Sequence, residues 1–375
     1  MILFLLAIAA GAGVGIIYGL LSMGLAYRFN ILAIPNRRTL HTLPTPRAGG
    51  FRFALPAILY ALSISLLLPY LFQRLNIPPH PEWWEQYSQR FYFLTGTVGL
   101  LVFWFALIDD MRNTPAWFKL LWQVLVAVLS AAVVHRHVAW LDLPGAGLVA
   151  LSPQIGFVFA VVWILLVMNA FNFMDGINGL AAGCGLGIIT GTVLVLGQGY
   201  EPSHHLMLFW AVLGGALAAF HIVNQSGREF MGDCGSQFLG YLFAITPLVW
   251  NNSWKAPLPW ASSVFFLLPF LYDVLRTLLV RALRGERLWE AHRDHLYQKF
   301  ARIGWPHRRI VAFYAPLYIL CIWCGVTYAR LDDPVRRLYL AVPAAAALVT
   351  YHILAIVIER RGLERLRREV PPAFR

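Results

Sequence analysis

The chain has 375 residues, of which 59% are hydrophobic and only 13% are charged, and its mean hydropathy is +0.63. Soluble domains average about 25% charged residues, so this composition excludes an ordinary soluble protein and favours one that lies in a bilayer. The net charge of +12 is typical of basic loops on one side of a membrane and of contact with anionic lipid headgroups. Because the basic residues lie in loops between apolar segments, we expect membrane lipids and no nucleic acid as partners.

Apolar segments follow one another along the whole chain, each close to the ~20 residues that a helix needs to cross a bilayer. They lie near residues 3–25, 53–72, 91–108, 117–134, 154–171, 177–197, 206–223, 236–250, 260–280, 310–328 and 338–358. The fifth and sixth are barely separated, so the sequence predicts an all-α polytopic membrane protein with ten or eleven transmembrane helices. No repeat and no long loop marks a second domain, and residues 1–375 are expected to form one transmembrane domain.

The positions of arginine and lysine predict how the chain is oriented. With eleven spans, the basic loops 26–52 and 281–309 and the basic tail lie on one side, together with loops 109–116, 172–176 and 224–235. Basic loops tend to stay in the cytoplasm. We therefore expect this side to be cytoplasmic and the N-terminus to be periplasmic.

Carboxylate and amide side chains gather at the cytoplasmic ends of these spans. They are Asp109, Asp110, Asn169, Asn172, Asp175, Asn178, Asn224 and Asp233. In the stretch "NAFNFMDGINGL", Asn169, Asn172 and Asp175 stand three residues apart and share one helix face. A charge at the centre of a membrane helix costs ~2.5–3.5 kcal/mol, and clustered carboxylates repel one another. A divalent cation relieves both costs, and oxygen ligands of this kind suit Mg²⁺ or Mn²⁺.

Taken singly, each of these residues also has a structural explanation. Asp109 and Asp110 could cap a helix, Asn172 could join two helices by a hydrogen bond, and Asp233 could belong to a plain glycine-rich turn. Asp273 and Arg276, both within the ninth predicted span, are expected to pair with each other. The placement of so many acids and amides on one side is what favours a functional site.

Four motifs in order resemble those of the polyprenyl-phosphate N-acetylhexosamine-1-phosphate transferases, glycosyltransferase family 4. "PNRRTLHTLPTPRAGG" (35–50) resembles the first cytoplasmic motif of that family, and "LIDD" (107–110) resembles its aspartate pair. "NAFNFMDGINGL" (169–180) and "MGDCGSQFLG" (231–240) resemble two further motifs. The resemblance implies a cytoplasmic-face enzyme of the bacterial inner membrane. Such an enzyme moves a sugar 1-phosphate from a UDP-N-acetylhexosamine to undecaprenyl phosphate and releases UMP with Mg²⁺.

The same resemblance implies roles for individual residues, which are carried over by motif position. Asn172 and Asp233 are expected to bind the metal, and Asp109, Asp110 and Asp175 are expected to be catalytic carboxylates. The residues expected to bind substrate are Asn36, Arg47, Lys119, Asn178, Arg293 and His295. Among them, Asn178 would contact uridine, while Lys119, Arg293 and His295 would contact phosphate.

Two departures from the family pattern bear on the choice of sugar. Ala33 stands where the first motif usually has an aspartate, and Tyr297 and Gln298 replace histidines of the last cytoplasmic loop. The form "AHRDHLYQ" looks most like the branch that starts O-antigen or other surface glycans, with GlcNAc or a 6-deoxy N-acetylhexosamine as the sugar. A homodimer is left open as the oligomeric state. The alternative function is a transporter or flippase, whose polar groups would form a path across the membrane.

Overall fold

A computed structural model describes residues 2–34, 43–74, 88–112, 114–134, 138–198, 204–250, 258–287 and 293–369. Asn36, one of the expected substrate contacts, lies outside the described residues. The described helices are α1 Ile2–Arg28, α2 Gly50–Arg74, α3 Gln89–Phe93, the π-helical turn Leu94–Val98, α4 Gly99–Arg112, α5 Ala116–Val134, α6 Pro153–Met174, α7 Leu180–Leu196, α8 His204–Gln225, α9 Gly232–Trp250, α10 Trp260–Leu283, α11 Leu296–Arg302, α12 His307–Arg330, α13 Pro334–Tyr339 and α14 Ala341–Glu369. Two short antiparallel pairs join β1 Leu32–Ala33 to β2 Thr45–Pro46 and β3 Trp140–Leu143 to β4 Gly147–Ala150.

The predicted all-α polytopic architecture is confirmed. Within the described residues, nine helical segments are long and apolar enough to cross a membrane, α3 through α4 counting as one. Two other helices, α7 with 17 residues and α9 with 19, stand at the positions of the sixth and eighth predicted spans. The separation of 154–171 from 177–197 is real, because the turn after α6 ends one helix and Gly179 begins the next.

Helix α9 lies at the centre of the bundle. It packs against α2, α4 and α6, and almost every side chain along it is buried. A methyl group on Gly240 would lie 2.8 Å from the Cα atom of Met168, so the two backbones approach too closely for a larger residue. The start of α9, which carries Asp233, is therefore held rigidly by the helices around it.

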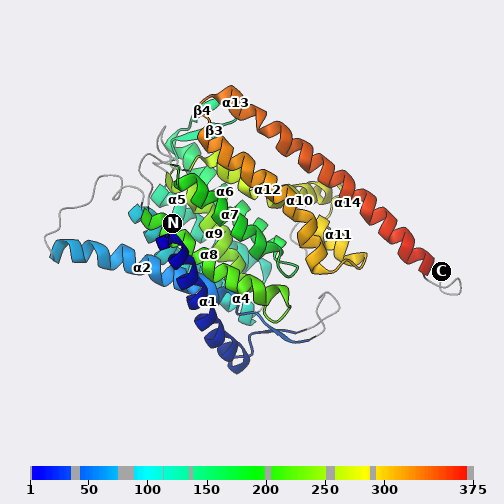
Figure 1. The fold of residues 1–375 in the computed structure, drawn as a ribbon, viewed down its shortest axis with the longest axis horizontal. Coiled ribbons are helices and arrows are strands. Elements are labelled where there is room, and N and C mark those ends of the chain that lie inside the picture. The colour runs from blue at the N-terminus through cyan, green and yellow to red at the C-terminus, as the bar shows by residue number, and fades with distance from the viewer. Residues whose placement is uncertain are drawn as a thin grey trace.

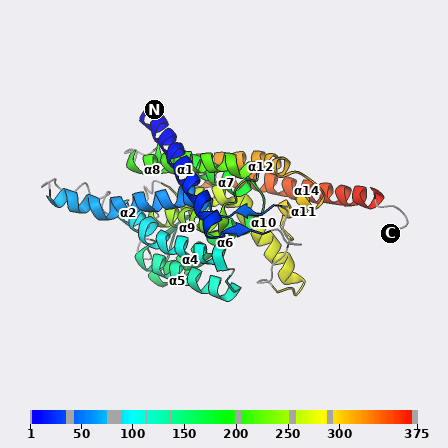
Figure 2. The ribbon, with the colours of Figure 1, turned by 90° about the horizontal axis from the view of Figure 1, so that it is seen from below.

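Helices α1 and α8 meet through a stripe of small residues. Gly11 and Gly15 are buried on α1, and a Cβ atom on Gly11 would lie 2.0 Å from the carbonyl oxygen of Val212 on α8. Small residues at this spacing allow membrane helices to pack closely. Figure 1 shows α1 and α8 side by side, and Figure 2 shows α2 and α14 extending in opposite directions from the bundle.

The end of the bundle that was expected to be periplasmic carries the β3–β4 hairpin. Asp142 of this hairpin accepts a 2.7 Å ion-pair contact from Arg337 of α13. Cys184, Cys234, Cys321 and Cys324 are all free and buried.

Candidate functional site

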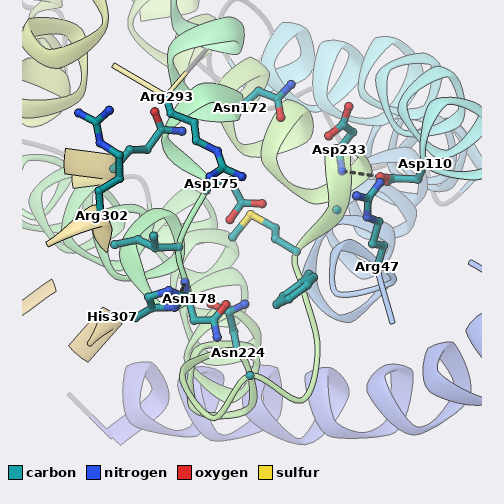
Figure 3. Close-up of a pocket in the computed structure, with 17 residues that line it drawn as sticks. Arg47, Asp110, Asn172, Asp175, Asn178, Asn224, Asp233, Arg293, Arg302 and His307 are labelled. Atoms are coloured by element: carbon teal, nitrogen blue, oxygen red, sulfur yellow. Dashed lines mark hydrogen bonds between the residues drawn. The ribbon is translucent and has the colours of Figure 1, made fainter. Parts of the chain in front are cut away.

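A cavity of about 460 Å³ lies where the ends of several helices meet, and we call it the pocket (Figure 3). Its lining comes from five segments: Arg47 before α2, the end of α4, the end of α6 with its following turn, the loop from α8 into α9, and residues 293–307 around α11. These segments were predicted to lie on one side of the membrane, and the structure brings them together. Figure 3 shows Asp110 and Asp233 on one side of the pocket and Arg293 and Arg302 on the other.

Asp110 holds the N-terminus of α9 in place. Its carboxylate accepts hydrogen bonds from the backbone N–H groups of Asp233 and Cys234, each at 3.0 Å. These are groups that a helix start leaves without intrahelical partners. Asp110 lines the pocket as well, so it fixes the position of Asp233 within the same wall.

The glycine before Asp233 is required by the backbone. Gly232 has a φ of +73°, and a Cβ atom there would lie 2.5 Å from the carbonyl oxygen of Arg47. The same atom would lie 2.8 Å from Oδ2 of Asp110. A larger residue would therefore push α9 away from both neighbours.

Lys119 bridges two carboxylates beside the pocket. Its Nζ forms an ion pair with Asp109 and lies 3.3 Å from Oδ2 of Asp233. Asp109 is almost fully buried and accepts hydrogen bonds from the N–H and hydroxyl groups of Thr114 at 2.8 and 2.5 Å. Neither Asp109 nor Lys119 lines the pocket, so both can act on it only through Asp233, which does line it.

Asn172 and Asp175 enter the pocket from the last turn of α6. Oδ1 of Asn172 accepts a 3.0 Å hydrogen bond from Ser236 of α9. Asp175 receives no hydrogen bond to its carboxylate from any described residue, and burial together with Asp233 and Asp110 raises its pKa well above the usual range. Asn169, by contrast, turns away and donates to Gln123 of α5 at 3.0 Å, which is the interhelical use of an amide.

The donor set suits a hard divalent cation. Asp175 is a half-buried carboxylate that receives no hydrogen bond from the described residues, and Asp233 and the Asn172 amide lie in the same lining. Among the described residues, no three carboxylate, imidazole or thiolate groups already converge on one point. Mg²⁺ commonly takes only one or two protein carboxylates and fills its remaining positions with water and phosphate oxygens, so the residues present fit it.

Amides form the part of the pocket near Asn178. The Asn224 side chain joins two segments, because its Oδ1 accepts from the N–H of Gly179 at 2.6 Å and its Nδ2 donates to the carbonyl of Glu229 at 2.9 Å. The N–H of Asn178 donates to Nδ1 of His307 at 3.2 Å, which places the proton of a neutral imidazole on Nε2. Figure 3 shows Asn178, Asn224 and His307 close together in the pocket.

Arg293 lines the pocket as expected, but His295 does not. His295 is buried, and its Nδ1 lies 3.4 Å from Oδ1 of Asp273. Tyr297, which stands at a family histidine position, is buried too and donates through its hydroxyl to the carbonyl of Phe173 at 2.8 Å. A methyl group on Gly176 would overlap that hydroxyl, so Tyr297 supports the turn that carries Asp175.

The expected pair between Asp273 and Arg276 is wrong. Asp273 instead accepts hydrogen bonds from the N–H of Leu296 at 3.0 and 3.1 Å and from the hydroxyl of Tyr314 at 3.1 Å. Thr277 adds a further bond at 3.3 Å. A buried carboxylate is best stabilised by several donors, and the neighbouring helices supply them.

Four polar lining residues had no role in the predicted site: Gln298, Arg302, His307 and Asn224, the last noted only among the clustered amides. Arg302 belongs to the basic loop 281–309, and its charge was the only signal in the sequence. Gln298 lies on α11 and His307 begins α12, and spacing along the chain does not reveal that these two positions line the pocket.

Fold and pocket together define an all-α polytopic membrane protein with a pocket rich in acids, amides and arginines at one end of its helices. Comparison with known proteins agrees with this class. Residues 92–251 match the model of "Glycosyl transferase family 4".

Relatives extend the match over most of the chain. A decaprenyl-phosphate N-acetylglucosaminephosphotransferase of Mycobacterium tuberculosis is 28% identical over 80% of this chain and 75% of its own length. The Mycobacterium leprae protein of the same name is 28% identical over 80% of this chain and 76% of its own length. A phospho-N-acetylmuramoyl-pentapeptide-transferase of Lactiplantibacillus plantarum is 29% identical over 58% of this chain and 67% of its own length. The family-model match and these relatives make the chain similar to the polyprenyl-phosphate sugar-phosphate transferases of glycosyl transferase family 4.

Proposed function

We propose that the chain transfers an N-acetylhexosamine 1-phosphate from a UDP-sugar to undecaprenyl phosphate, releases UMP and starts a lipid-linked surface glycan. The observation that carries the proposal is the pocket itself. It joins an acid and amide wall to a basic wall at the end of membrane-crossing helices. A lipid-borne phosphate and a water-soluble nucleotide sugar can meet at such a place, and the relatives named for polyprenyl-phosphate chemistry support this reading.

In this proposal Asp175, Asp233 and the amide of Asn172 would hold one Mg²⁺, with Mn²⁺ as a substitute. The bound ion would neutralise the diphosphate and stabilise the departing UMP. Asn178 and Asn224 then bind the base, and Arg293 and Arg302 bind phosphate oxygens, for which guanidinium groups are well suited. Arg47, which lines the pocket, and Asn36, which lies outside the described residues, are also proposed to bind substrate, as the family motif implies.

The proposed step is a direct displacement. An oxygen of the lipid phosphate forms a new bond to the sugar-bearing phosphorus of the donor. The bond between that phosphorus and the bridging oxygen breaks, and UMP leaves with the electron pair. Lys119 lies against Asp109 and Asp233, so it can shift toward a phosphate that approaches Asp233.

Two residues take positioning roles in this mechanism. Asp110 holds the start of α9 and thereby Asp233, and His295 braces Asp273 at the start of α11. Their substitution would act through the geometry of the pocket, because each already has a partner within the protein.

Purified protein should be incubated with Mg²⁺, undecaprenyl phosphate and a panel of UDP-N-acetylhexosamines, with UMP and lipid product measured. Asp233→Asn is the test variant, and Asp332→Asn is the matched control because Asp332 is exposed at the other end of α12. The proposal is supported if the wild type and Asp332→Asn both form product from one sugar. Asp233→Asn, or the wild type with EDTA, should then form none. Metal-dependent UDP-sugar binding without UMP release from any donor would favour the transporter alternative.

A further inference from the structure

Helix α11 carries two residues of the pocket but is too short to fix its own orientation. It has seven residues, and isolated helices shorter than about 12–15 residues are marginal in water. Gln298 and Arg302 both line the pocket, and they share one face of α11 because they are four positions apart. The contacts at the two ends of α11 therefore decide where Arg302 lies.

The start of α11 is fixed by Asp273 of α10. The Asp273 carboxylate accepts hydrogen bonds from the N–H of Leu296 at 3.0 and 3.1 Å. A carboxylate is favourable at a helix N-terminus, where N–H groups lack intrahelical partners and the helix dipole is positive. This contact holds the first turn of α11 and leaves the last turn to be held by another group.

Glu359 of α14 holds the last turn of α11. Its Oε2 lies 2.8 Å from Nζ of Lys299, and its Oε1 lies 3.3 Å from Nη2 of Arg302. Each oxygen of the carboxylate thus contacts one cation. The negative charge of Glu359 also relieves the repulsion between two cations that are one turn apart. Among the described residues, no other acid lies within ion-pair distance of Lys299 or Arg302.

Close packing places Glu359 beside α11. Helix α14 continues ten residues beyond Glu359, and Figure 2 shows it next to α11. A Cβ atom on Gly362 of α14 would lie 2.7, 2.8 and 2.9 Å from three atoms of Ile303, the residue that follows α11. A larger residue at position 362 would therefore separate α14 from the end of α11.

The ion pair with Glu359 leaves most of the Arg302 guanidinium available to a ligand. Only Nη2 bonds Glu359, and within the described part of the chain no residue accepts a hydrogen bond from Nε or Nη1. A guanidinium group has five N–H donors in a planar fork, so one edge can contact a carboxylate while another binds phosphate oxygens. Arg302 is 45% exposed, so these donors are accessible.

We propose that Glu359 is a positioning residue, which holds Arg302 in the orientation that meets the phosphate groups of the nucleotide sugar. This inference rests on the proposed function, in which Arg302 binds phosphate. Glu359 does not line the pocket, so it acts on a ligand only through Arg302. Lys299 does not line the pocket either, and it has no part in binding the nucleotide.

The test measures binding of UDP with Mg²⁺ to the full-length protein in nanodiscs, by isothermal titration calorimetry. The variants are Glu359→Gln, Arg302→Gln and the double variant. We expect Arg302→Gln to weaken UDP binding about tenfold, as for loss of a charge-assisted contact. Glu359→Gln should weaken it about threefold to fivefold, in the range of a partly exposed ion pair. The double variant should bind UDP as Arg302→Gln does, because Glu359 acts through Arg302.

Two matched controls remove charges nearby. Glu364→Gln removes an exposed acid of the same helix, and Lys299→Gln removes the other cation that contacts Glu359. Both should bind UDP like the wild type. Gly362→Val keeps every charge but pushes α14 away from Ile303, so it should weaken binding as Glu359→Gln does. In the transfer assay, Glu359→Gln should raise KM for the nucleotide sugar and leave KM for the lipid acceptor and kcat near the wild-type values, a split that a general loss of folded protein would not produce.

UDP binding by Glu359→Gln that is as tight as in the wild type, or tighter, would overturn the proposal. A further loss in the double variant would also overturn it, because Glu359 would then act by a route other than Arg302. The same holds for Arg302→Gln with wild-type affinity, since Glu359 would have nothing to position, and for an equal loss in Glu364→Gln. These outcomes leave the proposed function standing, whereas a wild-type protein that binds no UDP would overturn both.

Discussion

The ion pair between Arg52 of α2 and Glu229 can be used to test how much a buried ion pair contributes to the free energy of unfolding. Glu229 lies in the loop before α9 and is 0% exposed, Arg52 is 5% exposed, and their Nε and Oε2 atoms are 2.5 Å apart. Ser22 of α1 adds a longer contact of 3.4 Å. Burial raises the pKa of Glu229 by more than Arg52 lowers it, so desolvation outweighs the attraction between the two charges.

Replacing one partner should therefore be far worse than replacing both. Glu229→Gln leaves a buried guanidinium unpaired and should lower the free energy of unfolding by ~3–5 kcal/mol. The double variant Arg52→Met/Glu229→Leu removes both charges and should match the wild type or exceed it by ~1–4 kcal/mol. Arg336→Gln is the control, because that arginine is 73% exposed and its pair should contribute below ~1 kcal/mol.

The assay is thermal unfolding of the detergent-solubilised protein, followed by tryptophan fluorescence. Glu229→Gln should lower the apparent midpoint by roughly 5–10 °C, with Arg336→Gln unchanged. A double variant as unstable as Glu229→Gln would refute the reasoning, because the pair would then stabilise the fold by itself. So would a Glu229→Gln variant as stable as the wild type.

Three further predictions concern the walls of the pocket. Because the pKa of Asp175 is raised, its contribution to stability is fully present below the usual carboxyl pKa of 3.8 and is lost as pH rises from there through the raised value; in metal-free buffer the wild type should lose stability over this rise in pH, and Asp175→Asn should lose less in the same melting scans. Asn224→Ala removes two buried hydrogen bonds and should lower the free energy of unfolding by about 2–3 kcal/mol, measured against Gln225→Ala, whose melting curve should stay near wild type. Tyr297→Phe leaves the Phe173 carbonyl at the end of α6 without this donor and should cost about 0.5–1.5 kcal/mol and lower kcat; unchanged kcat would argue against a positioning role.

The helices were predictable because they depend on one property, the length of each apolar segment. All eleven predicted segments coincide with helices among the described residues, and α14 continues past the predicted end at residue 358 to Glu369. The bilayer imposes this length, so local sequence is sufficient to find it. The β3–β4 hairpin was missed because its stability comes from contacts with α13, which lies almost 200 residues away.

The pocket was predictable only in part, for a reason visible in Asp273 and Asn169. The predicted ends of spans brought Asp110, Asn172, Asp175 and Asp233 to one cavity, because topology alone fixes which ends share a side. The rotation of each helix about its own axis decides which group a side chain bonds. Spacing on one helix paired Asp273 with Arg276 and aligned Asn169 with the site, whereas the structure gives both residues partners on other helices.

The bonds from Asp110 to the first turn of α9 have a consequence for how the pocket can move. They tie the end of α4 to the start of α9, and Ser236 ties that same turn to α6. Three helices therefore hold the acid wall as one unit, which cannot widen without breaking buried hydrogen bonds. The opposite wall is joined through single side-chain contacts such as those of His307 and Tyr297. We therefore expect the α11 and α12 side of the pocket to move when a bulky substrate enters and when product leaves. The acids on the other wall should keep a constant spacing throughout.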